Sequence, residues 1–487
     1  MVRVASRDCR RVSTYPVLFW YALNYYAIMK GPIVLFCAQA FGQPFPANLP
    51  HNRITGTVWR SGNPLITRRQ LQNNDKDTTM KTVKFALGTL GTVLILAGCG
   101  GGGGGVASTN TTGFTSMVVF GDSLSDIGSY KVGVVAAVGG GKWTVNSPAA
   151  KNWTESVAAQ YNLPAPCAAQ TGLLSIIPGI TAVPVQNFSA CRNYAQGSSR
   201  VSNPAGPNSI AIQQGVFAAV KGAGGTDEQA GQAAGNAAGL GLMALPIVSQ
   251  MANHLANAGG AYSGNELVTI MAGGNDTFMN LNGVANAAAG GGGAVAAAQF
   301  AGWTAGVQAS VAAGGAAAAG AAQQAAVAGM TQAANELAAA VNTQLLAKGA
   351  KYVAVVNLPD VSQTPFAATL DAATRGFVNT LVTTFNTALN AGLAGKAGVI
   401  IVDAYTQGRD QVANPAQYTL SSVTARACDA SSPANPLRGS SLTCTANSTV
   451  AGDTSKYLFA DDVHLSPFGN QLLAQFVTKN LITASWQ

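Results

Sequence analysis

The stretch Ser116-Met-Val-Val-Phe-Gly-Asp-Ser123 carries the clearest structural signal in this chain of 487 residues. Its apolar, β-branched part, residues 116–120, is typical of a buried strand, and the Gly-Asp pair that follows is typical of the turn that ends one. Three further runs have the same form, at residues 265–271, 351–357 and 398–403. Strands that are apolar along almost their whole length predict a parallel sheet covered on both faces.

Helical patterns separate these runs. Apolar residues recur at helical spacing in residues 323–346, 375–393 and 466–482, and Pro467 suits a first helical turn. Strands that alternate with helices predict a doubly wound α/β fold, in which ligands bind beyond the carboxyl ends of the strands. We interpret the Ala- and Gly-rich segment 285–329 as a loop that feeds the long helix, close to the mouth of the pocket.

The charge of the chain is distributed unevenly. The net charge is +8, but residues 1–98 hold 12 Lys and Arg against 3 acidic residues, whereas residues 99–487 hold 15 against 16. A main body with balanced charge does not favour a nucleic-acid-binding surface, so no nucleic-acid partner is expected. Charged residues make up 9% of the chain, which excludes a charge-rich disordered protein or a long coiled coil.

Residues 80–98 have the features of an export signal. Lys81 and Lys84 precede an apolar stretch, residues 85–96, that is too short to span a bilayer. The stretch ends in Leu-Ala-Gly-Cys99, which resembles a bacterial lipobox and predicts that Cys99 becomes the lipidated N-terminus. Residues 99–113 then form a Gly-rich flexible tether. The alternative is a short buried helix that ends in a glycine turn.

The segment in front of this signal allows two interpretations. Either Met80 is the biological start and residues 1–79 are an upstream extension outside the fold, or the apolar run at 15–41 is a membrane span. We favour the first, because a second export signal behind a span would be redundant. The folded domain is therefore expected at 114–487. The protein is expected to be exported and lipid-anchored in the cell envelope, in the outer membrane.

The cysteines fit an exported protein. Cys99 is assigned to the lipid, which leaves an even number in an oxidising compartment. Three pairings are possible for Cys167, Cys191, Cys428 and Cys444. The sequence-local pairs, Cys167 with Cys191 and Cys428 with Cys444, close loops of 24 and 16 residues, and each contributes roughly 3 kcal/mol in the chain-entropy description. The alternative is four free buried thiols.

Two histidines follow Cys99, and one of them fits an acid–base role. A serine hydroxyl becomes a nucleophile when a base takes its proton, and histidine suits that task near neutral pH. His254 has no carboxylate close in sequence, whereas His464 has Asp461 three residues before it. A short turn could aim this carboxylate at the imidazole. The sequence therefore predicts a triad of Ser123, His464 and Asp461, with Asp462 as the alternative acid.

Four sequence blocks carry a family resemblance. They occur in the order Phe-Gly-Asp-Ser-Leu-Ser-Asp at 120–126, Asn-Tyr-Ala-Gln-Gly at 193–197, Gly-Gly-Asn-Asp at 273–276 and Phe-Ala-Asp-Asp-Val-His-Leu-Ser-Pro at 459–467. In this order they resemble the GDSL lipases and esterases, or SGNH hydrolases, and more narrowly the bacterial outer-membrane esterase and phospholipase branch. The resemblance implies a three-layer α/β/α, flavodoxin-like fold with a mostly parallel five-stranded sheet.

The same resemblance implies an oxyanion hole. Its donors would be the backbone N–H groups of Ser123 and Gly197 and the side-chain amide of Asn275. The family usually has a second glycine where this chain has Ser198. No phosphate-binding loop and no His-Glu-x-x-His sequence occurs, so neither a cofactor nor a metal is expected.

These observations predict an exported serine ester hydrolase that forms an acyl-enzyme on Ser123. Its substrate would be a small-molecule or lipid acyl ester, and its membrane contact would be the lipid on Cys99. One alternative within enzymes is a phospholipase, a lysophospholipase or a lipid acyltransferase at the membrane surface. An alternative from a different class is a surface-binding lipoprotein that retains the fold without activity.

Overall fold

A parallel sheet forms the centre of the structure. The computed structural model describes residues 113–486. Its main sheet has the order β1-β4-β5-β6, and all neighbouring strands are parallel. The strands are β1 Ser116–Gly121, β4 Glu266–Met271, β5 Tyr352–Val356 and β6 Val399–Val402. The four strands predicted from the apolar runs are therefore confirmed, each to within about one residue at its ends.

The predicted fifth strand is replaced by an irregular segment along β1, residues 192–196. Tyr194 N donates to the Val119 carbonyl at 2.8 Å, and Gln196 N donates to the Gly121 carbonyl at 3.1 Å. Only one bridge, Val119 to Asn193, is regular, because the Asn193 side chain accepts the N–H of Ala195 and turns the backbone there. The sheet therefore has four strands, where we predicted five. The segment still lies at the edge beside β1, where a flavodoxin-like order has its second strand.

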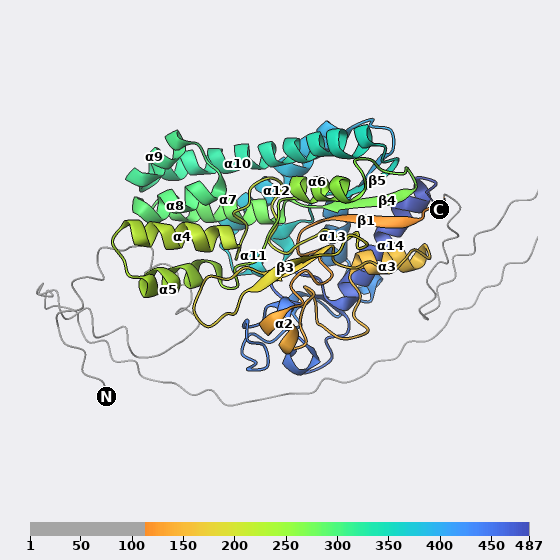
Figure 1. Ribbon diagram of the computed structural model, residues 1–487, viewed down its shortest axis with the longest axis horizontal. Helices are drawn as coiled ribbons and strands as arrows, with labels where there is room; N and C mark the ends of the chain where they lie inside the picture. Colours follow the sequence, from red (N-terminus) through yellow and green to blue (C-terminus); the bar gives the residue numbers. More distant parts are fainter. Residues whose placement is uncertain (1–112, 487) are drawn as a thin grey trace, which may run out of the picture. The chain divides into compact units, whose positions relative to one another are not determined.

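Helices cover both faces of the sheet, as the apolar strands predicted (Figure 1). Successive side chains of a strand point to opposite faces. Val118 and Phe120 of β1 pack with helices α6 Ile247–Asn257, α10 Gly315–Ala340 and α12 Ala372–Leu393. Met117 and Val119 pack on the other face with α3 Trp153–Gln160 and α14 Pro467–Thr483. The predicted three-layer α/β/α architecture is confirmed.

The three predicted helices are present, and the first two are longer than the segments predicted from their apolar spacing. The first is α10, which continues through a π-helical turn, η3 Val341–Leu345, and a 3-10 turn, η4 Leu346–Lys348. The second is α12, where the Asp371 side chain accepts the N–H groups of Ala373 and Thr374. The third is α14, where the Ser466 side chain accepts the N–H of Gly469. Such caps satisfy donors that have no partner inside the helix.

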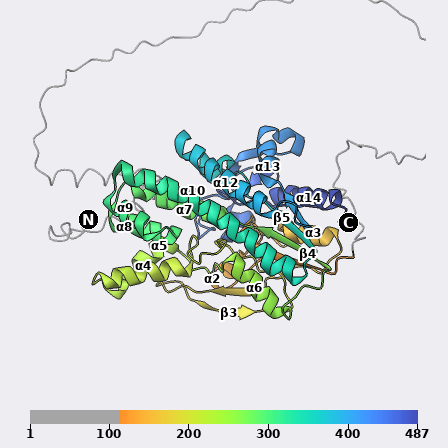
Figure 2. The same cartoon turned by 90° about the horizontal axis from the view of Figure 1, so that it is seen from above.

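The Ala- and Gly-rich segment is helical, so its interpretation as a loop is wrong. It contains the end of α7 Gly274–Ala287, then α8 Gly291–Ala301 and α9 Ala305–Ala313, which gather beside the start of α10 (Figure 2). Alanine is the best helix former, and several of the glycines lie at helix ends, where they do not interrupt a helix. Gly302 and Gly314, for example, have φ values of 89° and 72°.

Smaller elements complete the described chain. They are α2 Gly133–Ala137, β2 Gln170–Leu173, β3 Val183–Asn187, α4 Ile210–Gly222, α5 Asp227–Ala238, η5 Val361–Gln363, α11 Pro365–Ala368, α13 Ala404–Ala413, η6 Pro415–Tyr418, β7 Ser422–Arg426, η7 Ser441–Thr443, η8 Ala446–Ser448 and β8 Tyr457–Phe459. β2 and β3 pair antiparallel, and β7 and β8 pair parallel. Within residues 113–486, no helix combines the length and apolarity that a bilayer crossing needs.

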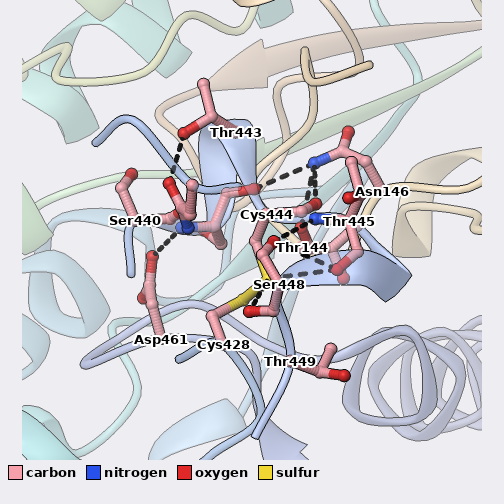
Figure 3. The surroundings of a disulfide bond; sticks show 12 residues. Thr144, Asn146, Cys428, Ser440, Thr443, Cys444, Thr445, Ser448, Thr449 and Asp461 are labelled. Carbon is pink, nitrogen blue, oxygen red and sulfur yellow. Dashed lines mark hydrogen bonds between the residues drawn. A yellow bond between two sulfur atoms is a disulfide. The ribbon is translucent and has the colours of Figure 1, made fainter. Parts of the chain in front are cut away.

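Both disulfides of the sequence-local pairing are present. They join Cys167 to Cys191 and Cys428 to Cys444. Figure 3 shows the second bond beside Asn146, whose side-chain amide donates to the Cys444 carbonyl at 3.0 Å. The upstream segment 1–79, the export signal 80–98 and Cys99 lie outside the described residues, as does all of the tether but its last residue.

His254 is a buried histidine that has no hydrogen-bond partner among residues 113–486. Both of its ring nitrogens are unpaired, and the ring lies among those of Phe120, Tyr194 and Tyr262, at centroid distances of 4.8 to 5.9 Å. Burial, helped by the positive charge of Arg192, lowers the pKa of His254 to about 4. Its neutral form is therefore the one that the fold accommodates.

This environment predicts how stability depends on pH. The unfolded chain binds a proton at His254 near pH 6.5 and the folded chain near pH 4, so stability falls as pH drops between these values. A pKa unit corresponds to about 1.4 kcal/mol, and the loss by pH 4 is on the order of 2 to 3 kcal/mol. His254→Phe should remove this part of the pH dependence of stability, because phenylalanine does not bind a proton. Urea unfolding of both proteins at pH 8 and pH 5 measures it, and an equal loss in both would contradict the prediction.

Candidate active site

Ser123 lies in the turn that follows β1, at the carboxyl edge of the sheet. Ser125 N donates to the Asp122 carbonyl at 3.0 Å, and Leu124 N donates to Asp122 Oδ1 at 3.0 Å. A side chain at Gly121 would place its Cβ 2.8 Å from the Met271 carbonyl, so glycine is required where the strand runs closest to β4. These constraints fix the backbone of Ser123, whose side chain faces a cavity.

His464 and Asp461 complete a hydrogen-bonded chain with Ser123. His464 Nε2 lies 2.8 Å from Ser123 Oγ, and His464 Nδ1 lies 2.8 Å from both carboxylate oxygens of Asp461. All three residues are buried. The structure thus brings together three residues that the sequence separates by up to 341 positions.

The Asp461 carboxylate is held in its charged form. Its oxygens accept the backbone N–H groups of Ser441, Val463 and His464 at 2.8 to 3.0 Å. Burial by itself would raise the pKa of Asp461. The charge of His464 and these hydrogen bonds outweigh burial and hold the pKa well below its ordinary value. The carboxylate can therefore orient the imidazole and stabilise its protonated form.

Asp462 has a different environment. Its Oδ1 pairs with Arg426 Nη1 at 2.8 Å, both side chains are partly exposed, and Asp462 makes no hydrogen bond to His464. Burial raises the pKa of this carboxyl, and Arg426 opposes that effect. Of the two candidate acids, Asp461 is the one that contacts the histidine.

A buried carboxylate, Asp126, organises the wall behind His464. It accepts the backbone N–H groups of Gly128, Ser129 and Gly197 at 2.8 to 2.9 Å, and Trp143 Nε1 lies 3.4 Å from it. The Trp143 ring lies over the His464 ring at a centroid distance of 4.7 Å. Neither residue was predicted from the sequence as part of the site. Asp126 ends the motif at 120–126, but Trp143 lies in no motif that could have revealed it.

Gly197 leaves room for Trp143 and does not face the cavity. A Cβ at residue 197 would lie 2.4 Å from the Trp143 ring, so only glycine allows this packing. The family resemblance assigned the N–H of Gly197 to the oxyanion hole. In the structure this N–H donates to Asp126 Oδ2 at 2.9 Å. The neighbouring Ser198 lines the cavity instead. Ser198 has a φ of 70°, a conformation that favours glycine and that the family's usual glycine would adopt without strain.

Asn275 reaches the cavity from the first turn of α7. Its amide donates to the Ser199 carbonyl at 2.9 Å, and an amide carries a second N–H that this bond does not use. The buried pair Arg200–Asp276, 2.9 Å apart, and the bond from Val201 N to Asp276 Oδ2 tie α7 to residues 198–201. Ser198 and Asn275 are thereby held next to one another.

The cavity that these residues line has a volume of about 280 Å³. It is bounded by Ser123, His464, Asn275, Ser198 and Trp143, together with mainly apolar side chains. Asp122 also lines it, and burial raises the pKa of this carboxyl to about 6. Among residues 113–486 there is no cluster of His, Cys, Asp and Glu that could hold a metal ion. The donor set suits acyl transfer by a serine nucleophile.

Comparison with known proteins shows the family. Residues 117–477 match the sequence model of the GDSL-like lipase/acylhydrolase family. A region of 142 residues is 32% identical to "Esterase EstA" of Pseudomonas aeruginosa and, to the same extent, to "Esterase EstA" of Pseudomonas putida. It covers 28% of this chain, and the chain spans about a fifth (21%) of the length of these curated relatives. The chain therefore belongs to the GDSL-like lipase/acylhydrolase family, a family of enzymes that hydrolyse ester bonds.

Proposed function

We propose that this protein hydrolyses carboxylic esters through an acyl-enzyme on Ser123. The observation that carries the proposal is the hydrogen-bonded chain from Ser123 Oγ through His464 to Asp461, with both links at 2.8 Å. His464 takes the serine proton as the hydroxyl attacks the ester carbonyl, then gives it to the leaving alkoxide. Water, activated in the same way by His464, releases the acid and restores Ser123.

The developing oxyanion needs N–H donors at the cavity wall. We assign these to the Ser123 backbone, the second N–H of Asn275 and the backbone of Ser198. Ser198 replaces the donor expected at residue 197, since the Gly197 N–H is bonded to Asp126 and Ser198 lines the cavity. Gly197 then acts indirectly, because its lack of a side chain lets Trp143 pack over His464.

We also propose that the domain at 114–487 is exported and anchored through a lipid on Cys99, with residues 1–79 outside the mature protein and the tether at 99–113. The lipobox-like sequence and the two disulfides support this proposal. The relatives' name, esterase, fits the proposed chemistry.

Ser123→Ala tests the chemistry directly. Loss of the nucleophile should lower kcat on p-nitrophenyl butyrate by a factor of about 10⁴ or more. The thermal midpoint should change little, because the Ser123 hydroxyl has one hydrogen bond, to His464. A variant that keeps more than a tenth of the wild-type rate would refute the assignment, and a fluorophosphonate probe that labels the wild type but not the variant would confirm the site.

Asp461→Asn and Asp462→Asn form a matched pair. The first removes the charge that orients His464, and kcat should fall about 10³- to 10⁴-fold. The second breaks an exposed ion pair with Arg426, so kcat should stay within about threefold. Steady-state kinetics at pH 8 compares them. Equal losses in the two variants would mean that Asp461 has no special role.

Intact-mass analysis tests the proposed maturation. Protein purified from membranes should have a mass that begins at Cys99, increased by the lipid and decreased by four hydrogens for the two disulfides. Cys99→Ser should release the protein from the membrane fraction while its specific activity stays close to that of the wild type. A mature protein that contains residues before Cys99 would contradict this processing.

A further inference from the structure

The cavity at Ser123 and His464 continues among apolar side chains of the protein core. Met271, Leu358, Leu458 and Leu473 line it, and each of these residues is at least nine-tenths buried. The cavity therefore reaches inward from the carboxyl edge of the sheet, toward helix α14. Its volume of about 280 Å³ is close to the lower end of the roughly 300–1,000 Å³ typical of small-molecule sites.

One face of α13 forms a wall of this cavity. Ala404, Gln407, Gly408 and Gln411 all line it, and their spacing of i, i+3, i+4 and i+7 places them on the same side of the helix. At the centre of this face Gly408 contributes no side chain, and a Cβ built there would have no atom within 4 Å. The wall thus has a gap where other residue types would narrow the cavity.

We propose that Gly408 of α13 determines which chain lengths this enzyme accepts. The hydrocarbon chain of the ester lies in the apolar chamber lined by Met271, Leu358, Leu458 and Leu473, and the gap at Gly408 sets the length of chain that fits. The inference rests on the function proposed above, because the chamber is continuous with the cavity of Ser123. Burial of each methylene group should increase kcat/KM roughly fourfold until the chamber is full. Both the acid chain and the alcohol chain of an ester begin at the reacting carboxyl group, so the experiment varies the length of each chain separately.

Gln411 is a second lining residue whose substitution changes the polarity of the chamber. It is buried, and its side-chain amide has no hydrogen-bond partner within the part of the chain that the structure describes. An unpaired amide in an apolar chamber opposes the binding of hydrocarbon. Gln411→Leu should therefore strengthen the preference for longer chains, and it does so without filling the gap at Gly408.

The experiment uses the full chain and two ester series. p-Nitrophenyl acetate, butyrate and octanoate vary the acid, and methyl, butyl and octyl acetate vary the alcohol. In the wild type, kcat/KM for the longest chain should exceed that for the shortest at least about tenfold in one series. Gly408→Phe should lower this ratio at least about tenfold, and Gln411→Leu should raise it. Gly306 lies on the exposed surface of α9, so Gly306→Phe is the matched control and should leave the ratio unchanged.

The outcomes separate this inference from the proposed function. Activity that survives in Ser123→Ala overturns both. If Ser123→Ala is inactive but neither series shows a preference in the wild type, the chamber does not bind hydrocarbon. A ratio that Gly408→Phe leaves unchanged also overturns the role of α13. If Gly408→Phe fails to fold by circular dichroism, Gln411→Leu decides, and an unchanged ratio in that variant counts against the inference.

Discussion

The first turn of α3 connects the two halves of the active site. The Asn152 side chain donates to the Leu124 carbonyl at 2.8 Å, in the turn that carries Ser123. The next residue, Trp153, donates its N–H at 3.0 Å to the side chain of Asn470, in the first turn of α14. Asn470 in turn donates to the Leu465 carbonyl, next to His464. The distance between the serine and the histidine depends on these buried hydrogen bonds, because the sheet itself positions only the serine.

The disulfides act on the segments that regular structure does not hold. Cys191 directly precedes residues 192–196, which follow β1 with a single regular bridge before the chain reaches Ser198. Cys444 lies three residues after Ser441, whose N–H bonds to Asp461. A cross-link restricts the unfolded chain, and the loss of entropy on ordering these segments is therefore smaller. Covalent restraint thus falls beside both the segment that leads to Ser198 and the segment that bonds to Asp461.

The sequence could predict the sheet, the covering helices and the contact of Ser123, His464 and Asp461, because each depends on local patterns. Apolar runs at 116–120 and 351–357 are buried on both faces, and Asp461 lies one turn from His464. It could not predict that the Gly197 N–H bonds to Asp126 while Ser198 lines the cavity. This arrangement depends on Asp126 and Trp143, which meet residue 197 only in the folded chain. The helices α8 and α9 were not predicted for another reason. Short helices that end in glycine and glycine-rich loops have the same amino-acid composition, so composition does not distinguish them.

The two aspartates beside the reacting groups show why residue type alone does not define a role. Asp461 is buried and accepts three backbone N–H groups, and its pKa lies far below the ordinary value. Asp122 is also buried, but burial, reinforced by the negative charge of Asp276, outweighs its hydrogen bond from the N–H of Leu124 and raises its pKa to about 6. Burial acts alike on both, so the number of donors, together with the nearness of His464, decides the difference. The fold therefore keeps a full negative charge behind the imidazole and lets the carboxyl next to Ser123 lose its charge in mild acid.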